Sequence, residues 1–139
     1  MSWREIRPVA LGVVCRGEEL LLAEHRDPTA GERFYRPLGG AIEFGERGEA
    51  ALRREFREEL GVELAGVEYV ETYERVFTFD GTEGHELQRV YEADIVEAWP
   101  YERERFEGEE PELGETFPVV WKEPAALGEE TVYPPELLD

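Results

Sequence analysis

The segment from Arg47 to Leu60 constrains the fold of this chain most, because it is the stretch that most clearly predicts a helix. It contains neither proline nor β-branched residues, consists largely of good helix formers, and is followed directly by Gly61, a residue type that commonly ends helices. Leu52, Phe56 and Leu60 recur every four residues, so they form an apolar stripe on one helical face. The sequence therefore predicts one long helix that packs against a sheet.

Segments of apolar and β-branched residues on both sides of this helix predict the strands. We expect paired strands at 6–15 and 20–25, a long hairpin formed by 67–79 and 87–96, and a further strand at 117–121. Residues 27–40 and 99–116 are expected to be connections, and 124–127 and 134–138 to be short helices. Strands that are partly adjacent and partly separated by a helix predict an α/β (α+β) fold with a mixed sheet covered by helices.

Length and charge limit the domain organisation and the partners. The 139 residues suit a single domain spanning 1–139. The net charge is -19 and the basic residues are scattered, which argues against non-specific binding of nucleic-acid backbones. The apolar run 8–15 is too short to span a membrane, and Cys15 is the sole cysteine, so no intramolecular disulfide can form. We therefore expect a cytoplasmic protein that does not bind membranes.

Three glutamates share one face of the predicted helix. Glu58 and Glu59 lie three and four positions after Glu55, and like charges at this spacing are unfavourable by roughly 0.2–0.5 kcal/mol per pair. A divalent cation such as Mg²⁺ would neutralise them, since it takes oxygen ligands and commonly shares them with substrate phosphates. The alternative is a solvated acidic surface in a glutamate-rich chain. Arg54 is placed to hold Glu58, its i+4 neighbour, or a carboxylate outside the helix.

The residues around these acids favour the metal site. From Gly40 to Val62 the sequence fits G-x5-E-x7-R-E-U-x-E-E-x-G-U, where U is a bulky apolar residue, and abundant glutamate does not explain the glycines, the arginine or the apolar positions. This pattern resembles the defining box of the Nudix hydrolase family. Residues 36–40 and Trp121 also resemble the usual surroundings of that box. One departure is Arg47-Gly48, where many members have a Ser or Thr that caps the helix.

The resemblance implies an α/β/α sandwich whose loop-helix-loop motif binds Mg²⁺ or Mn²⁺ and hydrolyses a diphosphate linkage in a small-molecule nucleoside diphosphate joined to another group X. It implies metal binding by the Gly39 carbonyl, Glu55, Glu58 and Glu59, and catalytic roles for Glu46, Arg54, Glu55 and Glu59. Glu46 would act beside the ligands or through water, and Arg54 would orient a carboxylate. Homodimers are common in the family. The general base is either Glu55 or Glu59, or one of the acids outside the helix, Glu109, Glu110, Glu112 and Glu115.

The substrate-binding residues lie outside the box. Arg26, Arg33 and Arg36 could hold phosphates, and His85 and Glu86 could reach the substrate. Solvated arginines and a surface histidine are the alternatives. The aromatic residues considered as stacking surfaces for a base, or else as core, are Tyr73, Phe77, Trp99 and Tyr101.

Two further functional classes remain open. A Nudix-fold module could sense a nucleotide or metabolite without cleaving it, and an acidic interaction protein could use the glutamates only as surface. The intact box favours catalysis.

Overall fold

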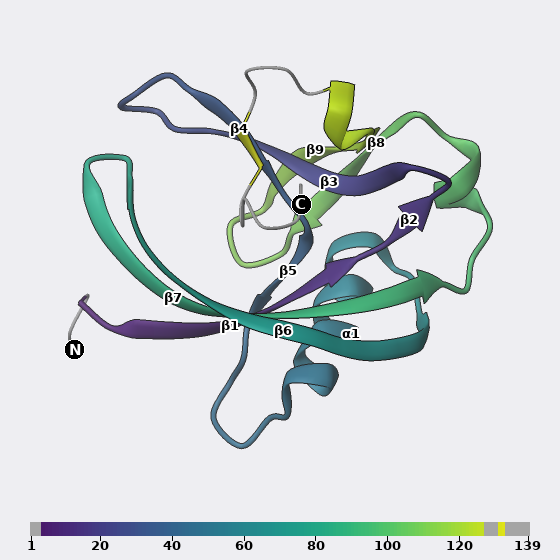
Figure 1. The fold of residues 1–139 in the computed structure, drawn as a ribbon, viewed down its shortest axis with the longest axis horizontal. Helices are drawn as coiled ribbons and strands as arrows, with labels where there is room; N and C mark the ends of the chain where they lie inside the picture. The colour runs from purple at the N-terminus through teal and green to yellow at the C-terminus, as the bar shows by residue number, and fades with distance from the viewer. Residues whose placement is uncertain (1–3, 127–130, 133–139) are drawn as a thin grey trace.

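A first mixed sheet carries much of the molecule. The computed structural model describes residues 4–126 and 131–132. In this sheet the strand order is β5-β1-β7-β6, with β1 antiparallel to β5 and parallel to β7 (Figure 1). The bounds are Leu38–Ala41 for β5, Ile6–Val13 for β1, Thr82–Ile95 for β7 and Leu64–Phe79 for β6. The predicted mixed sheet is thus confirmed.

The second sheet follows the order β10-β4-β3-β9-β8, and the two-residue β2 pairs with β3. Its β10–β4 pair is parallel, whereas β4–β3, β3–β9 and β9–β8 are antiparallel. The bounds are Thr131–Val132 for β10, Arg33–Arg36 for β4, Glu19–Arg26 for β3, Glu115–Lys122 for β9, Arg105–Glu110 for β8 and Cys15–Arg16 for β2.

The predicted pairing of 6–15 with 20–25 is wrong for most of its length. Only Cys15 and Arg16 pair with β3, while β1 lies between β5 and β7 in the other sheet. The chain leaves the first sheet at Val14, which lies between β1 and β2 and is fully buried. Two predicted connections also contain strands: 27–40 holds β4 and β5, and 99–116 holds β8 after a 3-10 helix at Trp99–Glu102.

The predicted long hairpin is confirmed as β6 and β7, which pair antiparallel along nearly their whole length. A two-residue turn, Asp80-Gly81, connects them, and both residues have positive φ, 51° and 73°. Two consecutive positive φ values characterise the type I′ turn, whose twist matches that of the flanking strands. The turn is therefore tighter than the interval 80–86 that the predicted strands leave between them.

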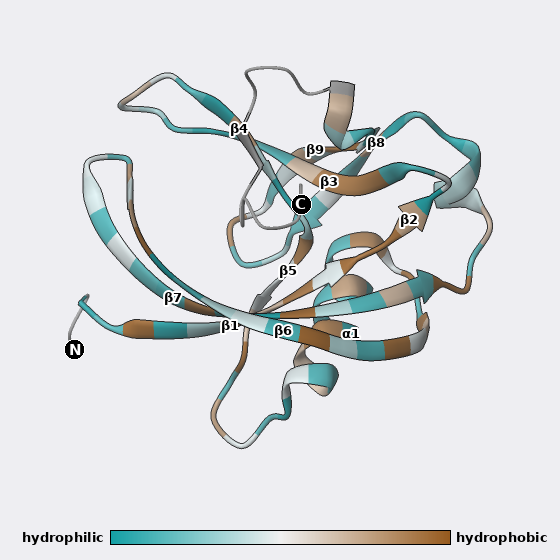
Figure 2. Ribbon diagram, in the orientation of Figure 1, coloured by the Kyte–Doolittle hydropathy of each residue, from teal (hydrophilic) through white to brown (hydrophobic). Residues whose placement is uncertain are grey.

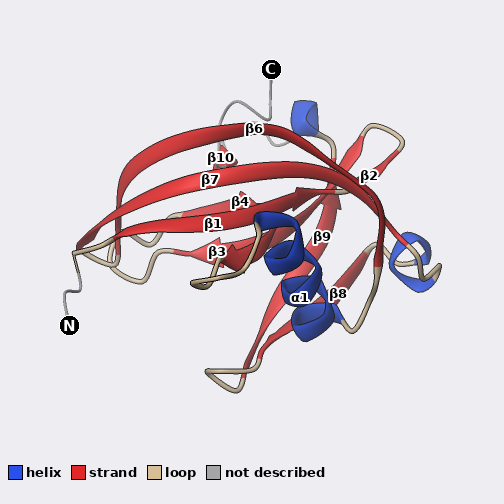
Figure 3. Ribbon diagram, turned by 90° about the horizontal axis from the view of Figure 1, so that it is seen from below, coloured by secondary structure: helices blue, strands red, loops and turns tan. Residues whose placement is uncertain are grey.

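The helix α1 spans Gly48–Leu60, close to the prediction. Arg47 is its N-cap and makes no side-chain cap hydrogen bond, whereas Gly61 ends it at φ 70°, with its N–H donating to the Arg57 carbonyl. Figure 3 shows α1 between the β1–β7–β6 sheet and strands β8 and β9, and α1 contacts β1, β5 and β8. Leu52 and Phe56 are fully buried.

The main core joins the helix to both sheets. Figure 2 shows hydrophobic residues in the middle of β3 and on α1, and Leu21, Leu52 and Phe56 from these elements are buried in this core. Gly12 permits the close approach of β1 to the helix, since a Cβ there would lie 2.9 Å from the Phe56 ring. Steric room on the strand therefore sets the position of α1, and with it the direction of the box glutamates.

The described residues contain one α-helix and the 3-10 helices at Trp99–Glu102 and Pro124–Ala126. The latter occupies the site of the helix predicted at 124–127, while the helix predicted at 134–138 lies outside the described residues. No helix in the described part of the chain is long and apolar enough to cross a membrane.

Candidate active site

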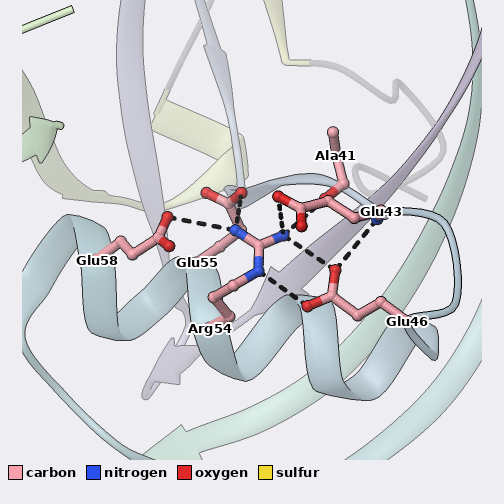
Figure 4. A network of polar contacts seen from close by, with 6 residues as sticks. All are labelled: Ala41, Glu43, Glu46, Arg54, Glu55 and Glu58. Carbon is pink, nitrogen blue, oxygen red and sulfur yellow. Dashed lines mark hydrogen bonds and ion pairs between the residues drawn. The ribbon is translucent and has the colours of Figure 1, made fainter. Parts of the chain in front are cut away.

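Arg54 joins the helix to the loop that precedes it. Its Nε donates to Glu46 Oε2 at 2.8 Å and its Nη2 to Glu46 Oε1 at 3.0 Å, a bidentate arrangement (Figure 4). Nη2 also donates to the Ala41 carbonyl at 3.0 Å and lies 3.7 Å from Glu43 Oε1. Charge-assisted bidentate pairs are strong and directional. They hold the pKa of Glu46 below its usual value, chiefly through the hydrogen bond from Arg54.

The same guanidinium holds two of the predicted metal ligands. Nη1 donates to Glu55 Oε1 at 3.0 Å and to Glu58 Oε2 at 3.3 Å (Figure 4). Arg54 thus contacts the i+4 glutamate and a carboxylate outside the helix, the two alternatives that the sequence left open. Its half-buried position and fixed fork make it a positioning group for the acids around it.

Glu59 is the most deeply buried of the three helical glutamates. Its relative exposure is 7%, and its Oε1 has no hydrogen-bond partner among the described residues. Burial, reinforced by the negative charges of Glu55 and Glu110 and opposed by Arg36, raises the pKa of Glu59 to about 9. A buried, unpaired carboxylate oxygen is costly, and a cation would relieve that cost.

Glycines bring the backbone of β5 against these acids. A Cβ on Gly40 would lie 2.5 Å from the carboxyl carbon of Glu55, so any larger residue there would displace that carboxylate from its present position. Gly39 has φ 150°, and a Cβ there would lie 1.9 Å from the Ala10 carbonyl oxygen. Burial is also the main cause of the raised pKa of Glu55, against the opposing effect of Arg54.

An acid from another element faces the helix. Glu110, the last residue of β8, has a raised pKa, first because of burial and then because of the charges of Glu112 and Glu58. As the described side chains stand, no three acidic, histidine or cysteine groups converge closely enough to hold a metal ion. The unpaired oxygen of Glu59 and the mutual repulsion of Glu55, Glu59 and Glu110 nevertheless suit a divalent cation.

Two adjoining cavities lie beside these groups. The acidic cavity, about 190 Å³, is lined by Gly39, Gly40, Glu59 and Glu110 together with residues of β1, β3 and β9. The aromatic cavity, about 500 Å³, has walls from Phe34, Phe77 and Phe79. The two cavities share five lining residues and therefore lie side by side: Arg7, His25, Arg36, Glu86 and Glu110.

The family is decided by a match over nearly the whole chain. The NUDIX domain family model matches residues 6–137. The chain belongs to the Nudix family.

Similar proteins agree with this assignment. The chain is 41% identical over 69 residues to the NAD-capped RNA hydrolase NudC of Pseudomonas aeruginosa strain PAO1, a match that covers 50% of this chain and 24% of that protein. It thus spans about a quarter of the curated relatives that it matches. The MutT NUDIX hydrolase from Burkholderia pseudomallei superposes with a TM-score of 0.65 at 22% identity, covering 97% and 96% of the two chains. A NUDIX-family hydrolase from Clostridium perfringens gives 0.63 at 20% identity, covering 96% and 92%. At these identities the structures support the fold alone.

The predicted substrate-binding residues of this Nudix chain fall in different places. Arg36 lines both cavities and pairs with Glu86 at 3.3 Å. Arg26 instead donates to the Gly31 carbonyl, and His85 contacts Glu74 Oε2 at 2.8 Å; neither of them lines the two cavities. Arg36 and Glu86 therefore lie at the two cavities beside the box residues, whereas Arg26 and His85 lie away from these cavities.

The predicted stacking residues also separate. Phe77 lines the aromatic cavity. Trp99 and Tyr101 pack on the main core, where their rings contact Phe106 and Trp121. Tyr73 packs on the small cluster of Val9, Leu11 and Val90. Of the four, only Phe77 is thus placed to contact a ligand in the described cavities.

Sequence reasoning did not identify Arg7, Phe34, Phe79 or Gln88 as site residues, although all four line the aromatic cavity. Arg7 and Glu86 are register partners in the parallel β1–β7 pair, and residues so paired share a face of the sheet. That pairing has no local signal. The sequence does show Glu86 and Gln88 at alternate positions of an apolar strand, which could have marked a polar buried face.

Proposed function

We propose that this protein is a metal-dependent hydrolase that cleaves the diphosphate linkage of a small nucleoside diphosphate joined to another group X. The observation that carries the proposal is that the acidic and aromatic cavities adjoin and share Arg36 and Glu86 in their walls. The acidic cavity is lined by the carboxylates of Glu59 and Glu110 and by the backbone of Gly39 and Gly40. The aromatic cavity is lined by phenylalanine side chains. Such a site suits a ligand that is a planar ring at one end and a diphosphate at the other.

Mg²⁺ or Mn²⁺ would be held by carboxylates of Glu55, Glu58 and Glu59, with the Gly39 carbonyl as a further oxygen. When bound, the ion would draw charge from phosphoryl oxygens and make water more acidic. Glu59 and Glu55 are the helical candidates for the group that accepts the proton of the attacking water. Among the candidates for this base outside the helix, Glu110 is favoured because it lines the acidic cavity. Glu109, Glu112 and Glu115 do not line it.

Arg54 and Glu46 would act by positioning. Their bidentate pair fixes the loop before the helix, and Nη1 of Arg54 fixes the rotamer of Glu55. Arg36 would face the diphosphate, since it lines both cavities and is less exposed than Arg7, the other cation that lines both. A guanidinium suits bidentate contact with phosphate oxygens.

The substrate panel should begin with dinucleotides. The curated relatives are named NAD-capped RNA hydrolases, so NAD joins ADP-ribose, nucleotide sugars, dinucleoside polyphosphates and nucleoside triphosphates as a test compound. Each is incubated with the protein and Mg²⁺ or Mn²⁺, and the products are separated by chromatography. Release of a nucleoside monophosphate from at least one compound is expected.

Glu59→Gln provides the decisive variant. We expect its kcat to fall by about 10²-fold or more, because it loses a charge that both the ion and the proton transfer need. We also expect Mg²⁺ to raise the unfolding temperature of the wild type and to leave that of the variant unchanged. Glu63→Gln, on the exposed pair with Arg57 beyond the helix, is the control and should retain both properties.

Two outcomes would contradict the proposal. Tight binding of nucleotides without turnover of any compound in the panel would favour a sensing module. Equal activity of wild type and Glu59→Gln would remove this glutamate from the reaction.

A further inference from the structure

The aromatic cavity has the shape and lining of a site for a flat ring. Phe34 and Phe79 meet edge to face, with centroids 5.9 Å apart and planes at 82°. His25 stacks on Phe34 at 5.3 Å and 24°. Phe79 remains 39% exposed, a large apolar surface at the cavity wall. Aromatic side chains stack on any base and therefore do not distinguish one base from another.

One polar side chain in this cavity lacks a partner. Gln88 is only 3% exposed, its Nε2 donates to Glu86 Oε1 at 2.9 Å, and its Oε1 has no hydrogen-bond partner within the described part of the chain. Gln88 lines the aromatic cavity and not the acidic one. A buried acceptor without a partner costs about 1–3 kcal/mol, so a ligand that supplied a donor would recover this free energy.

The neighbours of Gln88 fix the orientation of its amide. Glu86 is 4% exposed and pairs with Arg36 at 3.3 Å and Arg7 at 3.9 Å. Its Oε1, which faces Arg36, also accepts the hydrogen bond from Gln88, so the NH₂ group of Gln88 turns towards it. The flipped amide would place two oxygen atoms against each other. The buried oxygen of Gln88 is therefore the group left without a partner in a side chain that lines the aromatic cavity.

We propose that Gln88 is a specificity-determining residue that selects substrates whose ring carries an amino group. The ring would lie against Phe34 and Phe79, and its exocyclic NH₂ would donate to Gln88 Oε1. The inference rests on the proposed function, because Arg36 and Glu86 connect this ring site to the acidic cavity that would hold the diphosphate. A site whose buried acceptor binds a hydrogen-bond donor of the substrate discriminates against analogues that lack this donor, because the acceptor then stays unpaired.

The test uses pairs of nucleoside diphosphates that differ by one amino group. The pairs carry adenine and purine, guanine and hypoxanthine, and cytosine and 2-pyrimidinone. Dissociation constants are measured by titration calorimetry with Mg²⁺ present, so the readout does not require turnover. For at least one pair, the wild type should bind the amino compound about 10-fold or more tightly than its partner, equivalent to about 1.4 kcal/mol.

Gln88→Met is the matching variant, because methionine has a similar length and offers no comparable acceptor. Its ratio of dissociation constants should fall to about 1–2, mainly through weaker binding of the amino compound. A purely structural role would weaken both members of a pair equally. Leu87→Met, on the adjacent and more exposed position of β7, should keep the wild-type ratio.

The inference is overturned if the wild type shows no discrimination in any pair, a result that does not depend on how well the variant folds. It is also overturned if a folded Gln88→Met retains the wild-type ratio. Discrimination without hydrolysis would uphold the role of Gln88 and reject the hydrolase. Hydrolysis without discrimination would uphold the hydrolase and reject the role of Gln88.

Discussion

At the scale of single residues, Arg54 shows how one side chain organises several acids. Its guanidinium contacts Glu46, Glu55 and Glu58 and also the Ala41 carbonyl, so its donors are distributed between the loop and the helix. A lysine has the same charge but cannot present this planar set of donors. The role of the side chain at position 54 therefore depends on its geometry as well as on its charge.

Arg54→Lys is expected to lower kcat/KM by about 10–100-fold, the usual effect of losing a group that orients metal ligands. The unfolding temperature should fall only slightly, because one ammonium–carboxylate contact can remain. Steady-state kinetics and thermal unfolding measure the two effects. Arg57→Lys, on an exposed ion pair with Glu63, is the control. Unchanged kinetics in Arg54→Lys would show that the bidentate contact is dispensable.

At the scale of secondary-structure elements, α1 begins without a side-chain cap. Arg47 has extended dihedral angles, φ −76° and ψ 153°, which suit an N-cap residue, yet its side chain makes no cap hydrogen bond. The first backbone N–H groups of the helix therefore lack the oxygen that Ser or Thr would provide. The departure from the family pattern seen in the sequence is thus visible in the helix itself.

Arg47→Ser should increase the free energy of unfolding by about 0.5–2 kcal/mol through a new cap hydrogen bond. Denaturant unfolding measures the change, and its midpoint should rise without a change in slope. Ala50→Ser, in the first turn but not at the cap position, is the control and should not give this gain in stability. A midpoint equal to that of the wild type would mean that other groups already satisfy the first turn.

At the scale of the whole molecule, His25 lies where three strands and both cavities meet. Its ring stacks on Phe34 of β4 and Phe117 of β9. Burial, followed by repulsion from Arg36 and partly opposed by Glu24, lowers the pKa of His25 from 6.5 to about 4. The folded protein thus holds a neutral imidazole, whereas the unfolded chain takes up a proton below pH of about 6.5.

His25 should therefore contribute to a loss of stability on acidification. Because its pKa is lower in the folded state, stability is complete above about pH 6.5 and declines as pH falls towards about 4. Between these values the wild type should lose roughly 1–3 kcal/mol more than His25→Phe, which keeps the stacking and removes the proton site. Denaturant unfolding across this range measures the difference. Parallel pH profiles of the two proteins would contradict the assignment.

Local spacing was sufficient to predict α1, the β6–β7 hairpin and the acidic face, because helical and strand geometry fixes which near neighbours share a side. It also indicated that Arg54 could reach Glu58. It could not indicate that β1 pairs with β7 and not with β3, since pairing between distant strands depends on how the whole core packs.

The sequence by itself determined the family and the order of the box residues, since these follow from residue type at fixed offsets. Only the tertiary structure decided that Glu110 faces the helix, that Arg7 pairs with Glu86 and that the buried Oε1 of Gln88 lacks a partner among the described residues. The first two contacts join residues far apart in the chain. Burial and sheet register create them, and neither is encoded in any short stretch.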